Sequence, residues 1–293
     1  MTLRIDSHQH FWRPARGDYG WLDASDPVLA PLVRDFLPAD MAPLRAAHGV
    51  AQTVLVQAAP SEAETDFLLD LANAHGFIGG VVGWVDLSDP RSARTLERWA
   101  RHPAFKSVRP MLQDLSDADW IAHAPHPAVV EALIGLGLRF DALVKPQHLP
   151  ALLYFVQRWP ALPVVIDHAA KPALADGWQA PWATNWRLGM AALAQQPQVV
   201  CKWSGLLTEA AGDARHEPGA ALAMLHPAWD HLLTHFGPQR LMWGSDWPVL
   251  TLASDYARWI DLTGTLAADL PADDQAALWH RTATRFYGLP GTA

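Results

Sequence analysis

The chain begins with a strand-like segment, residues 3–10, whose sequence is LRIDSHQH. Side chains of a strand alternate between its two faces, so His8 and His10 project to the same side, about 7 Å apart. Two imidazoles at the end of a strand can bind one metal ion or polarise one carbonyl group. They can equally be structural histidines with hydrogen bonds inside the core. No glycine-rich dinucleotide-binding loop follows the segment, which disfavours a Rossmann fold.

Short apolar or β-branched runs recur along the chain, each followed by a polar turn and a helix-like stretch. Together with the first segment they predict eight strands, at residues 3–10, 53–57, 80–85, 105–109, 138–143, 164–167, 199–203 and 241–244. Amphipathic stretches rich in alanine and leucine lie between them, at residues 62–75, 92–101, 127–136, 148–159, 186–195, 220–236 and 254–266. Such alternation indicates parallel βαβ units. The sequence therefore predicts an α/β fold, a (β/α)8 TIM-type barrel that forms a single domain over residues 1–293.

The composition suits one large globular domain. Half of the 293 residues are hydrophobic and 18% are charged, which is typical of a protein with a large core. The formal net charge of −8 disfavours broad attraction to nucleic acid or to an anionic membrane. Cys201 is the single cysteine and has no partner for an intramolecular disulfide, which fits a reducing compartment. The sequence shows no signal-peptide pattern and no apolar run near the ~20 residues that span a bilayer. We therefore expect a cytoplasmic protein without nucleic-acid or membrane partners.

A second motif, residues 241–248, has the sequence LMWGSDWP. It places Asp246 at the tip of the last expected strand. A carboxylate in that position can take a proton from water and return it to a leaving group. An aspartate before a loop is also common as a helix cap or turn residue, so this motif alone does not decide between the two roles.

Other strand ends carry further candidates. His168 comes just past the sixth expected strand, at the end of the barrel where active sites are built, although single histidines are more often structural. Arg109 ends the fourth strand, where it needs an anionic or polyhydroxylated partner or a salt bridge to a loop acid. Lys202 on the seventh strand can face the mouth of the barrel or pair on the outer face. Asp167 is expected to point away from the mouth or to orient a neighbouring residue.

Two long loops are expected at the same end of the barrel. Residues 13–38 follow the first strand, and residues 170–183, which include Lys171, follow the sixth. Both are candidate lids or substrate walls. Among the fifteen tryptophans, Trp12 and Trp247 are the two expected to lie beside the site, because each adjoins a motif described above.

Taken together, these motifs resemble the amidohydrolase superfamily, which places strand-one histidines and a strand-eight aspartate around a hydrolytic water. The segments IDSHQHFW (5–12) and WGSDWP (243–248) are similar, more narrowly, to the branch of sugar-lactone and 2-pyrone-4,6-dicarboxylate lactonases, and most closely to its L-fuconolactonase-like members. The resemblance runs the length of the chain. It implies a carboxylic-ester hydrolase that opens a sugar-acid lactone to the free acid.

The chain departs from many metal-dependent amidohydrolases. Those often carry a lysine late on the fourth strand and a histidine on the fifth, whereas here the fourth strand ends in Arg109 and the fifth has the sequence LRFDAL. The resemblance therefore implies that no cofactor is required, since lactonases of this branch are thought to work without a metal. A single Zn²⁺ ion remains possible, because imidazole and carboxylate ligands suit it. Its ligands would come from His8, His10, His168 and Asp246.

The resemblance also implies a mechanism. Asp246 takes a proton from the attacking water and later donates it to the ring oxygen of the lactone. The developing oxyanion is stabilised by His8, His10 and His168. Contacts to the sugar lactone, such as L-fucono-lactone, are expected from Arg109, Trp12, Trp247 and Lys171. A homo-oligomer is compatible with the sequence. Two alternatives stay open: a metal-dependent hydrolase or decarboxylase on the same barrel, and a catalytically silent barrel that binds sugars or partners.

Overall fold

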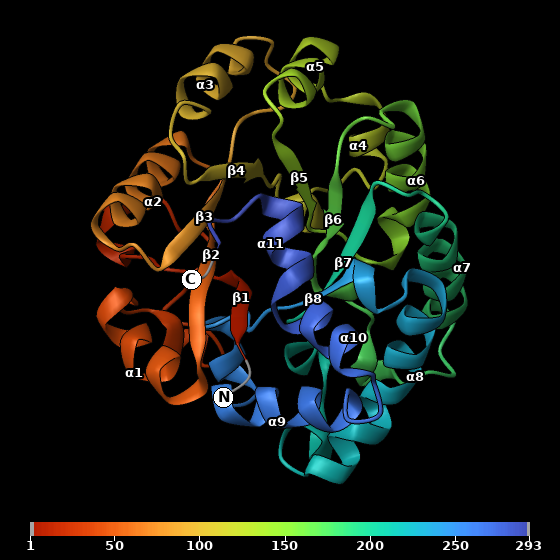
Figure 1. The fold of residues 1–293 in the computed structure, drawn as a ribbon. Coiled ribbons are helices and arrows are strands. Elements are labelled where there is room, and N and C mark those ends of the chain that lie inside the picture. Colours follow the sequence, from red (N-terminus) through yellow and green to blue (C-terminus); the bar gives the residue numbers. More distant parts are fainter. Residues whose placement is uncertain (1–2, 292–293) are drawn as a thin grey trace.

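The computed structural model describes residues 3–291 as a barrel of parallel strands surrounded by helices (Figure 1). Each strand pairs in parallel with the next one in the sequence. The eight strands are β1 (Arg4–Gln9), β2 (Val50–Val56), β3 (Ile78–Gly83), β4 (Phe105–Val108), β5 (Arg139–Ala142), β6 (Val164–Ile166), β7 (Val199–Trp203) and β8 (Leu241–Trp243). The predicted α/β barrel fold is confirmed. The two outermost residues at each end of the predicted domain, 1–2 and 292–293, lie outside the described residues.

Helices form the outer layer of the molecule. They are α1 (Pro38–His48), α2 (Glu62–Ala74), α3 (Ser92–Trp99), α4 (Trp120–His123), α5 (Pro127–Gly135), α6 (Leu149–Arg158), α7 (Trp182–Ala194), α8 (Pro218–Phe236), α9 (Tyr256–Leu266), α10 (Ala272–Ala276) and α11 (Thr282–Tyr287). The sequence pattern missed four of these. Pro43 interrupts α1, and α4, α10 and α11 span only 4, 5 and 6 residues, too few for helical periodicity to be visible.

The barrel closes where β8 meets β1. The backbone N–H of Asp246 donates to the carbonyl of His8 at 2.7 Å, and the N–H of His10 donates to the carbonyl of Trp247 at 2.8 Å. Gly244 allows this close approach, because a Cβ atom at that position would lie 2.9 Å from the Cβ of His8. The segments that complete the barrel are therefore the ones that carry the candidate site.

Helix α11 covers the N-terminal end of the barrel (Figure 1). Its Phe286 and Tyr287 pack against the side chains that fill the barrel interior, which are Ile5, Val54, Val56, Val82, Val165, Val200 and Met242. The carbonyl of Phe286 accepts a hydrogen bond from Arg139 at the start of β5. Apolar side chains therefore fill much of the N-terminal end of the barrel.

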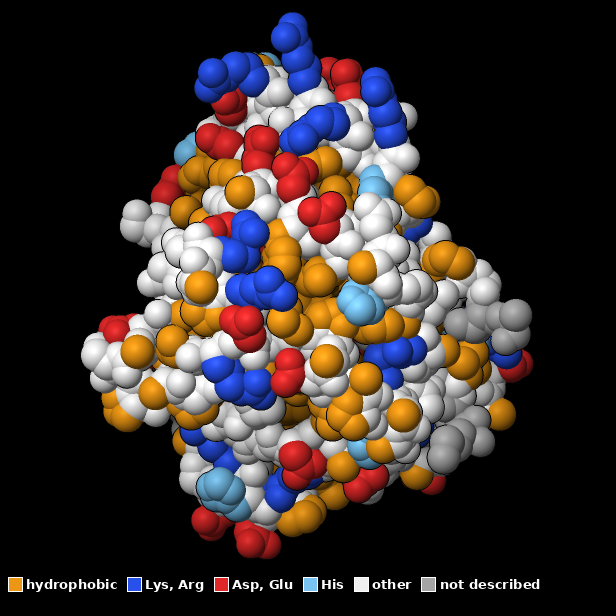
Figure 2. Space-filling model, turned by 90° about the vertical axis from the view of Figure 1, so that its left-hand side faces the viewer, with side chains coloured by type: hydrophobic (Ala, Val, Ile, Leu, Met, Phe, Trp, Pro, Cys, Tyr) orange, Lys and Arg blue, Asp and Glu red, His pale blue; other side chains and the backbone are white. Residues whose placement is uncertain are grey.

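The outer surface carries charges of both signs. Figure 2 shows the face formed by α1, α2 and α3, where acidic, basic and hydrophobic side chains are interspersed. On these helices Arg98 of α3 lies 3.7 Å from Asp66 of α2, so an exposed ion pair links the two. Among residues 3–291, no helix combines the length and the apolar character that crossing a membrane requires.

Candidate active site

A cavity of about 160 Å³ lies at the C-terminal mouth of the barrel. In (β/α)8 barrels this is the end at which active sites are assembled. Its lining includes most of the side chains that the sequence identified as candidates, namely His10, Trp12, Arg109, His168, Lys171 and Asp246. The strand ends thus converge on one small cavity, as the order of the motifs predicted.

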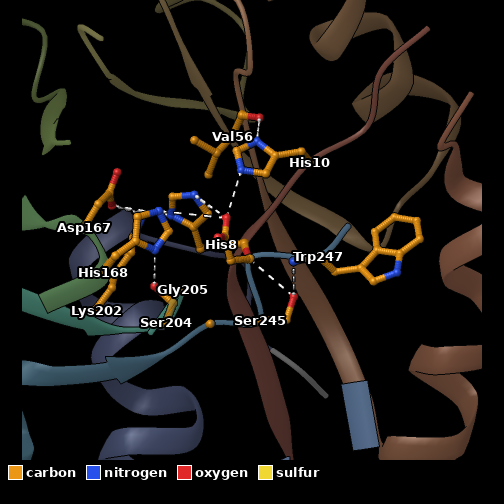
Figure 3. A network of polar contacts seen from close by, with 12 residues as sticks. His8, His10, Val56, Asp167, His168, Lys202, Ser204, Gly205, Ser245 and Trp247 are labelled. Carbon is orange, nitrogen blue, oxygen red and sulfur yellow. Dashed lines mark hydrogen bonds and ion pairs between the residues drawn. The ribbon is translucent and has the colours of Figure 1, made fainter. Parts of the chain in front are cut away.

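The end of β1 supplies two histidines whose ring centroids are 5.0 Å apart (Figure 3). The Nδ1 atom of His10 lies 2.8 Å from the carbonyl oxygen of Val56. A carbonyl only accepts hydrogen bonds, so this nitrogen carries a proton, and the Nε2 atom of the ring faces the Asp246 carboxylate. Burial, together with the nearby Lys202 ammonium, lowers the pKa of His8 well below its usual value. The His8 ring is therefore neutral at neutral pH.

Asp246 brings a carboxylate to the centre of these imidazoles. It follows β8 with a φ of 60°, in the left-handed region that residues with side chains rarely adopt. Its Oδ1 atom lies 3.3 Å from Nε2 of His10, 3.7 Å from that of His8 and 3.8 Å from that of His168. Burial alone would raise the pKa of Asp246, but the surrounding imidazoles, first that of His168, outweigh it and hold this pKa well below its usual value. The carboxylate is therefore ionised at neutral pH.

His168 enters the site from a left-handed turn. The φ angles of His168, Ala169, Ala170 and Lys171 are 52°, 50°, 61° and 47°. Each such residue costs roughly 1–2 kcal/mol, and strain of this kind clusters at functional sites. The Nδ1 atom of His168 lies 2.9 Å from the hydroxyl of Ser204 (Figure 3). Burial lowers the pKa of His168 to about 4, although nearby carboxylates oppose the change, so this ring is also neutral at neutral pH.

Arg109 and Lys171 bring positive charge to the wall of the cavity. Arg109 donates through Nη2 to the carbonyl of Gln57, and its Nη1 lies 3.6 Å from Asp167. The sequence left open whether Arg109 pairs with an acid or contacts a ligand. In the structure Arg109 pairs with an acid, and it also faces the cavity. The ammonium of Lys171 lies 3.2 Å from Glu209. Both cations are held in place by protein partners.

The two predicted tryptophans have different positions. Trp12 lines the cavity, whereas Trp247 packs behind it, with its ring centroid 6.0 Å from that of Phe11 and 5.4 Å from that of Phe36. In the part of the chain that the structure describes, Trp247 is not among the cavity-lining side chains. The indole that joins Trp12 there is Trp21 from the loop at residues 13–38, a residue that the sequence did not single out.

Below the histidines lies a buried ionic cluster that the sequence did not identify. The Nζ atom of Lys202 is 2.6 Å from Asp141 Oδ2 and 2.9 Å from Asp167 Oδ1, and all three side chains are fully buried. Asp167 lies inside the barrel, and its Oδ1 atom is 3.4 Å from Nδ1 of His8. A charge in the protein interior needs a partner. Ionisable residues at inward-facing strand positions were therefore the signal in the sequence that could have indicated this cluster.

The imidazoles and the carboxylate fit a single divalent metal ion. The Nε2 atom of His10 lies 3.3 Å from an oxygen of Asp246, and a nitrogen and a carboxylate oxygen this close require a proton or a cation between them. Ligand atoms held at about 2.0–2.1 Å by a tetrahedral zinc ion are roughly 3.3 Å apart. The candidate ligand atoms of His8, His10 and Asp246 all lie within 4.8 Å of one another. The donor set therefore suits zinc, the ion that the sequence left possible.

A barrel with a His-x-His at the end of β1, a histidine after β6 and an aspartate after β8 defines the class of amidohydrolase-type hydrolases. A family model described as amidohydrolase matches residues 5–289, and the chain belongs to this family. The resemblance predicted from the motifs is thereby confirmed.

Two curated relatives are named L-fucono-1,5-lactonase. The protein of Burkholderia ambifaria is 45% identical over 89% of this chain and 86% of its own length, and that of Burkholderia multivorans is 41% identical over 100% of this chain and 98% of its own. A crystal structure of an amidohydrolase from Burkholderia multivorans with bound zinc matches with a TM-score of 0.89 and 40% identity, covering 98% of this chain and 100% of that one.

Proposed function

We propose that this protein hydrolyses a sugar-acid lactone, with L-fucono-1,5-lactone as its substrate, to the free acid. One observation carries the proposal: the Oδ1 atom of the ionised Asp246 lies 3.3–3.8 Å from three imidazole nitrogens, and Asp246 lines a small cavity. Such a carboxylate can activate a water molecule that lies close to hydrogen-bond donors for an oxyanion. The choice of substrate rests on the similarity to two L-fucono-1,5-lactonases.

The first half of the reaction adds water to the lactone. Asp246 accepts a proton from the water while the water oxygen forms a bond to the carbonyl carbon. The carbonyl electrons move onto its oxygen, and that developing charge is stabilised by N–H groups of the neutral His8 and His168 rings, with the Arg109 guanidinium nearby. Because these groups are held by buried partners, they need little reorganisation when the charge appears.

The second half opens the ring. The tetrahedral intermediate collapses, the bond between the former carbonyl carbon and the ring oxygen breaks, and protonated Asp246 returns its proton to that oxygen. The product is a hydroxy acid, which releases one proton to solvent at neutral pH. The low pKa of Asp246 favours this return of the proton.

The remaining lining residues hold the substrate. Lys171 and Arg109 can donate hydrogen bonds to sugar hydroxyls, and the indole of Trp12 offers an apolar wall for the ring. Trp247 supports these residues from behind through its contacts with Phe11 and Phe36.

A metal ion is an optional part of this proposal. A zinc ion would be held by His10 and Asp246, and it would polarise the lactone carbonyl as a Lewis acid when bound.

The test is a panel of sugar lactones, assayed by acid release with and without a chelator, for wild type and for Asp246→Asn. We expect L-fucono-1,5-lactone to be hydrolysed best, with rhamnono-, galactono- and arabinono-lactones as the competitors. Asp246→Asn should lower kcat/KM by about 10²–10⁴-fold. Asp255→Asn is the matched control, because this exposed aspartate caps α9 and lies outside the cavity. Near-normal activity of Asp246→Asn, or no turnover of any lactone by wild type, would overturn the proposal.

A further inference from the structure

Lys202 on β7 is fully buried, and its ammonium meets three acceptors. Its Nζ atom lies 2.6 Å from Asp141 Oδ2, 2.9 Å from Asp167 Oδ1 and 3.1 Å from Nδ1 of His8. A lysine ammonium has three N–H bonds and accepts none. The contacts of Nζ with Asp141 and His8 are hydrogen bonds, and the contact with Asp167 is an ion pair.

This arrangement determines where His8 carries its proton. A nitrogen that accepts a hydrogen bond from Lys202 has no proton of its own, so the neutral ring is protonated on Nε2. That Nε2–H lies on the side of Asp246, whose Oδ1 atom is 3.7 Å away.

Two other contacts compete for the His8 ring. Nδ1 also lies 3.4 Å from Asp167 Oδ1, to which it could donate, but that oxygen already pairs with Lys202 at the shorter distance of 2.9 Å. Arg109 Nη1 could donate to an unprotonated His8 Nε2 at 3.4 Å, but this contact is longer than the 3.1 Å contact between Lys202 and Nδ1. The contact between Lys202 and His8, at 3.1 Å, is the shortest of the three that involve this ring.

The two histidines of the His-x-His motif therefore differ. His10 donates from Nδ1 to the carbonyl of Val56, which is the usual arrangement of a metal-ligating imidazole. His8 has the Lys202 ammonium beside its Nδ1 in place of that acceptor.

We propose that Lys202 is a positioning residue that holds His8 as a hydrogen-bond donor toward Asp246 and the lactone carbonyl, and thereby prevents His8 from serving as a metal ligand. The part that concerns the lactone rests on the proposed function, whereas the position of the proton does not. Loss of Lys202 lets His8 donate from Nδ1 to Asp167 and frees Nε2 for a metal ion.

The first measurement is the tautomer of His8 in metal-free enzyme, read from the 15N chemical shifts of its ring nitrogens and assigned with a His8→Asn variant. We expect a protonated Nε2 and an unprotonated Nδ1 in wild type. A protonated Nδ1 in wild type overturns the proposal, whether or not any lactone is hydrolysed. Failure of the lactone panel with the expected tautomer overturns only the proposed function.

The second measurement uses Lys202→Met combined with Asp141→Asn, so that removal of the cation is matched by removal of one carboxylate charge. Asp141→Asn alone is the control, because it keeps Lys202. In the double variant we expect the His8 proton on Nδ1, zinc binding by the free enzyme that is tighter by about 10-fold or more, and a lower metal-free kcat with little change in KM. An unchanged tautomer or unchanged zinc affinity overturns the proposal. If the double variant does not fold, the wild-type tautomer decides the question by itself.

Discussion

At position 205 the active site requires a glycine for a steric reason. Gly205 has a φ of +65°, and a Cβ atom there would lie 2.4 Å from Nδ1 of His168 and 3.1 Å from Oδ2 of Asp246. Gly205→Ala must therefore displace the His168 ring. Because a displacement of about 1 Å at a reacting group can cost 10²-fold, we expect kcat/KM to fall by about that factor. Steady-state kinetics with the preferred lactone measure the effect.

The same chain offers a control for the backbone strain. Gly137 has a φ of +66°, but the nearest atom to a Cβ there is Arg139 Nη1 at 4.0 Å. Gly137→Ala should lose roughly 1–2 kcal/mol of unfolding free energy, since it forces a side chain into the left-handed region, and Gly205→Ala should lose more because its Cβ also clashes with His168. Only Gly205→Ala should lose activity. Equal activity in the two variants would mean that the position of His168 does not matter for turnover.

Among the elements, α2 fixes the loop that follows β2. Glu64 on α2 is fully buried, and its carboxylate accepts hydrogen bonds from the backbone N–H groups of Ala58 and Ala59. The carbonyl of Ala58 accepts in turn from Nε1 of Trp21 at 2.8 Å, and that of Gln57 accepts from Arg109. The buried carboxylate of Glu64 thus fixes the loop whose carbonyl groups bind two cavity-lining side chains, Trp21 and Arg109.

Burial raises the pKa of Glu64 from 4.5 to about 7, despite the hydrogen bonds that oppose the change. The folded protein therefore binds this proton more tightly than the unfolded chain does. The stabilisation is complete below pH 4.5 and is lost as the pH rises toward 7. Relative to Glu64→Gln, which mimics the neutral acid, wild type should lose about 2–3 kcal/mol of unfolding free energy between roughly pH 5 and pH 8.

Denaturant titrations of both proteins at the two pH values measure this difference. Glu62→Gln is the control, because the Glu62 side chain lies on the same helix and is 44% exposed. It should show no comparable change between the two pH values. A wild type that instead gains stability over Glu64→Gln as the pH rises would contradict the raised pKa of Glu64.

The residues at the mouth of the barrel could be predicted from sequence, because motifs at strand ends of a barrel converge there. His8, His10, His168 and Asp246 were predicted together, and the structure brings their side chains within 3.8 Å of the carboxylate. Their roles in turnover stay a prediction. What sequence reasoning missed depends on three-dimensional packing, since neither the inward orientation of Lys202 nor its partner Asp141 follows from local periodicity.

The helices, too, could be predicted from sequence only in part. The helices in the repeating βα units were predicted to within a few residues, because each has an amphipathic pattern. Helix α7 begins at Trp182 instead of the expected residue 186, within the segment assigned to a loop. Helix α11 has 6 residues and a position defined only by the barrel end that it covers. Its place in the fold comes from long-range apolar contacts, which single-sequence patterns do not encode.

Across the whole molecule, a polar column joins the two ends of the barrel. We define it by five residues: Tyr287, Asp141, Lys202, His8 and Asp246. The hydroxyl of Tyr287 on α11 donates to Asp141 Oδ2 at 2.7 Å, and the same oxygen lies 2.6 Å from Lys202. Lys202 then contacts His8 at 3.1 Å. The covering helix at the N-terminal end is therefore connected by polar contacts to the active site at the other.

Tyr287→Phe removes the donor at the start of this column and keeps the ring in its apolar surroundings. A hydrogen bond to a charged group contributes about 1.5–3 kcal/mol, so we expect a loss of unfolding free energy of that size in denaturant titrations. Because Asp141 then holds Lys202 less firmly, kcat should also fall, by roughly 2–30-fold, with a smaller change in KM. Phe286→Leu is the control, since this neighbour packs in the same apolar cluster and makes no side-chain hydrogen bond. The Phe286→Leu variant should lose stability with kcat unchanged. If Tyr287→Phe also loses stability with kcat unchanged, α11 supports the fold without affecting the chemistry.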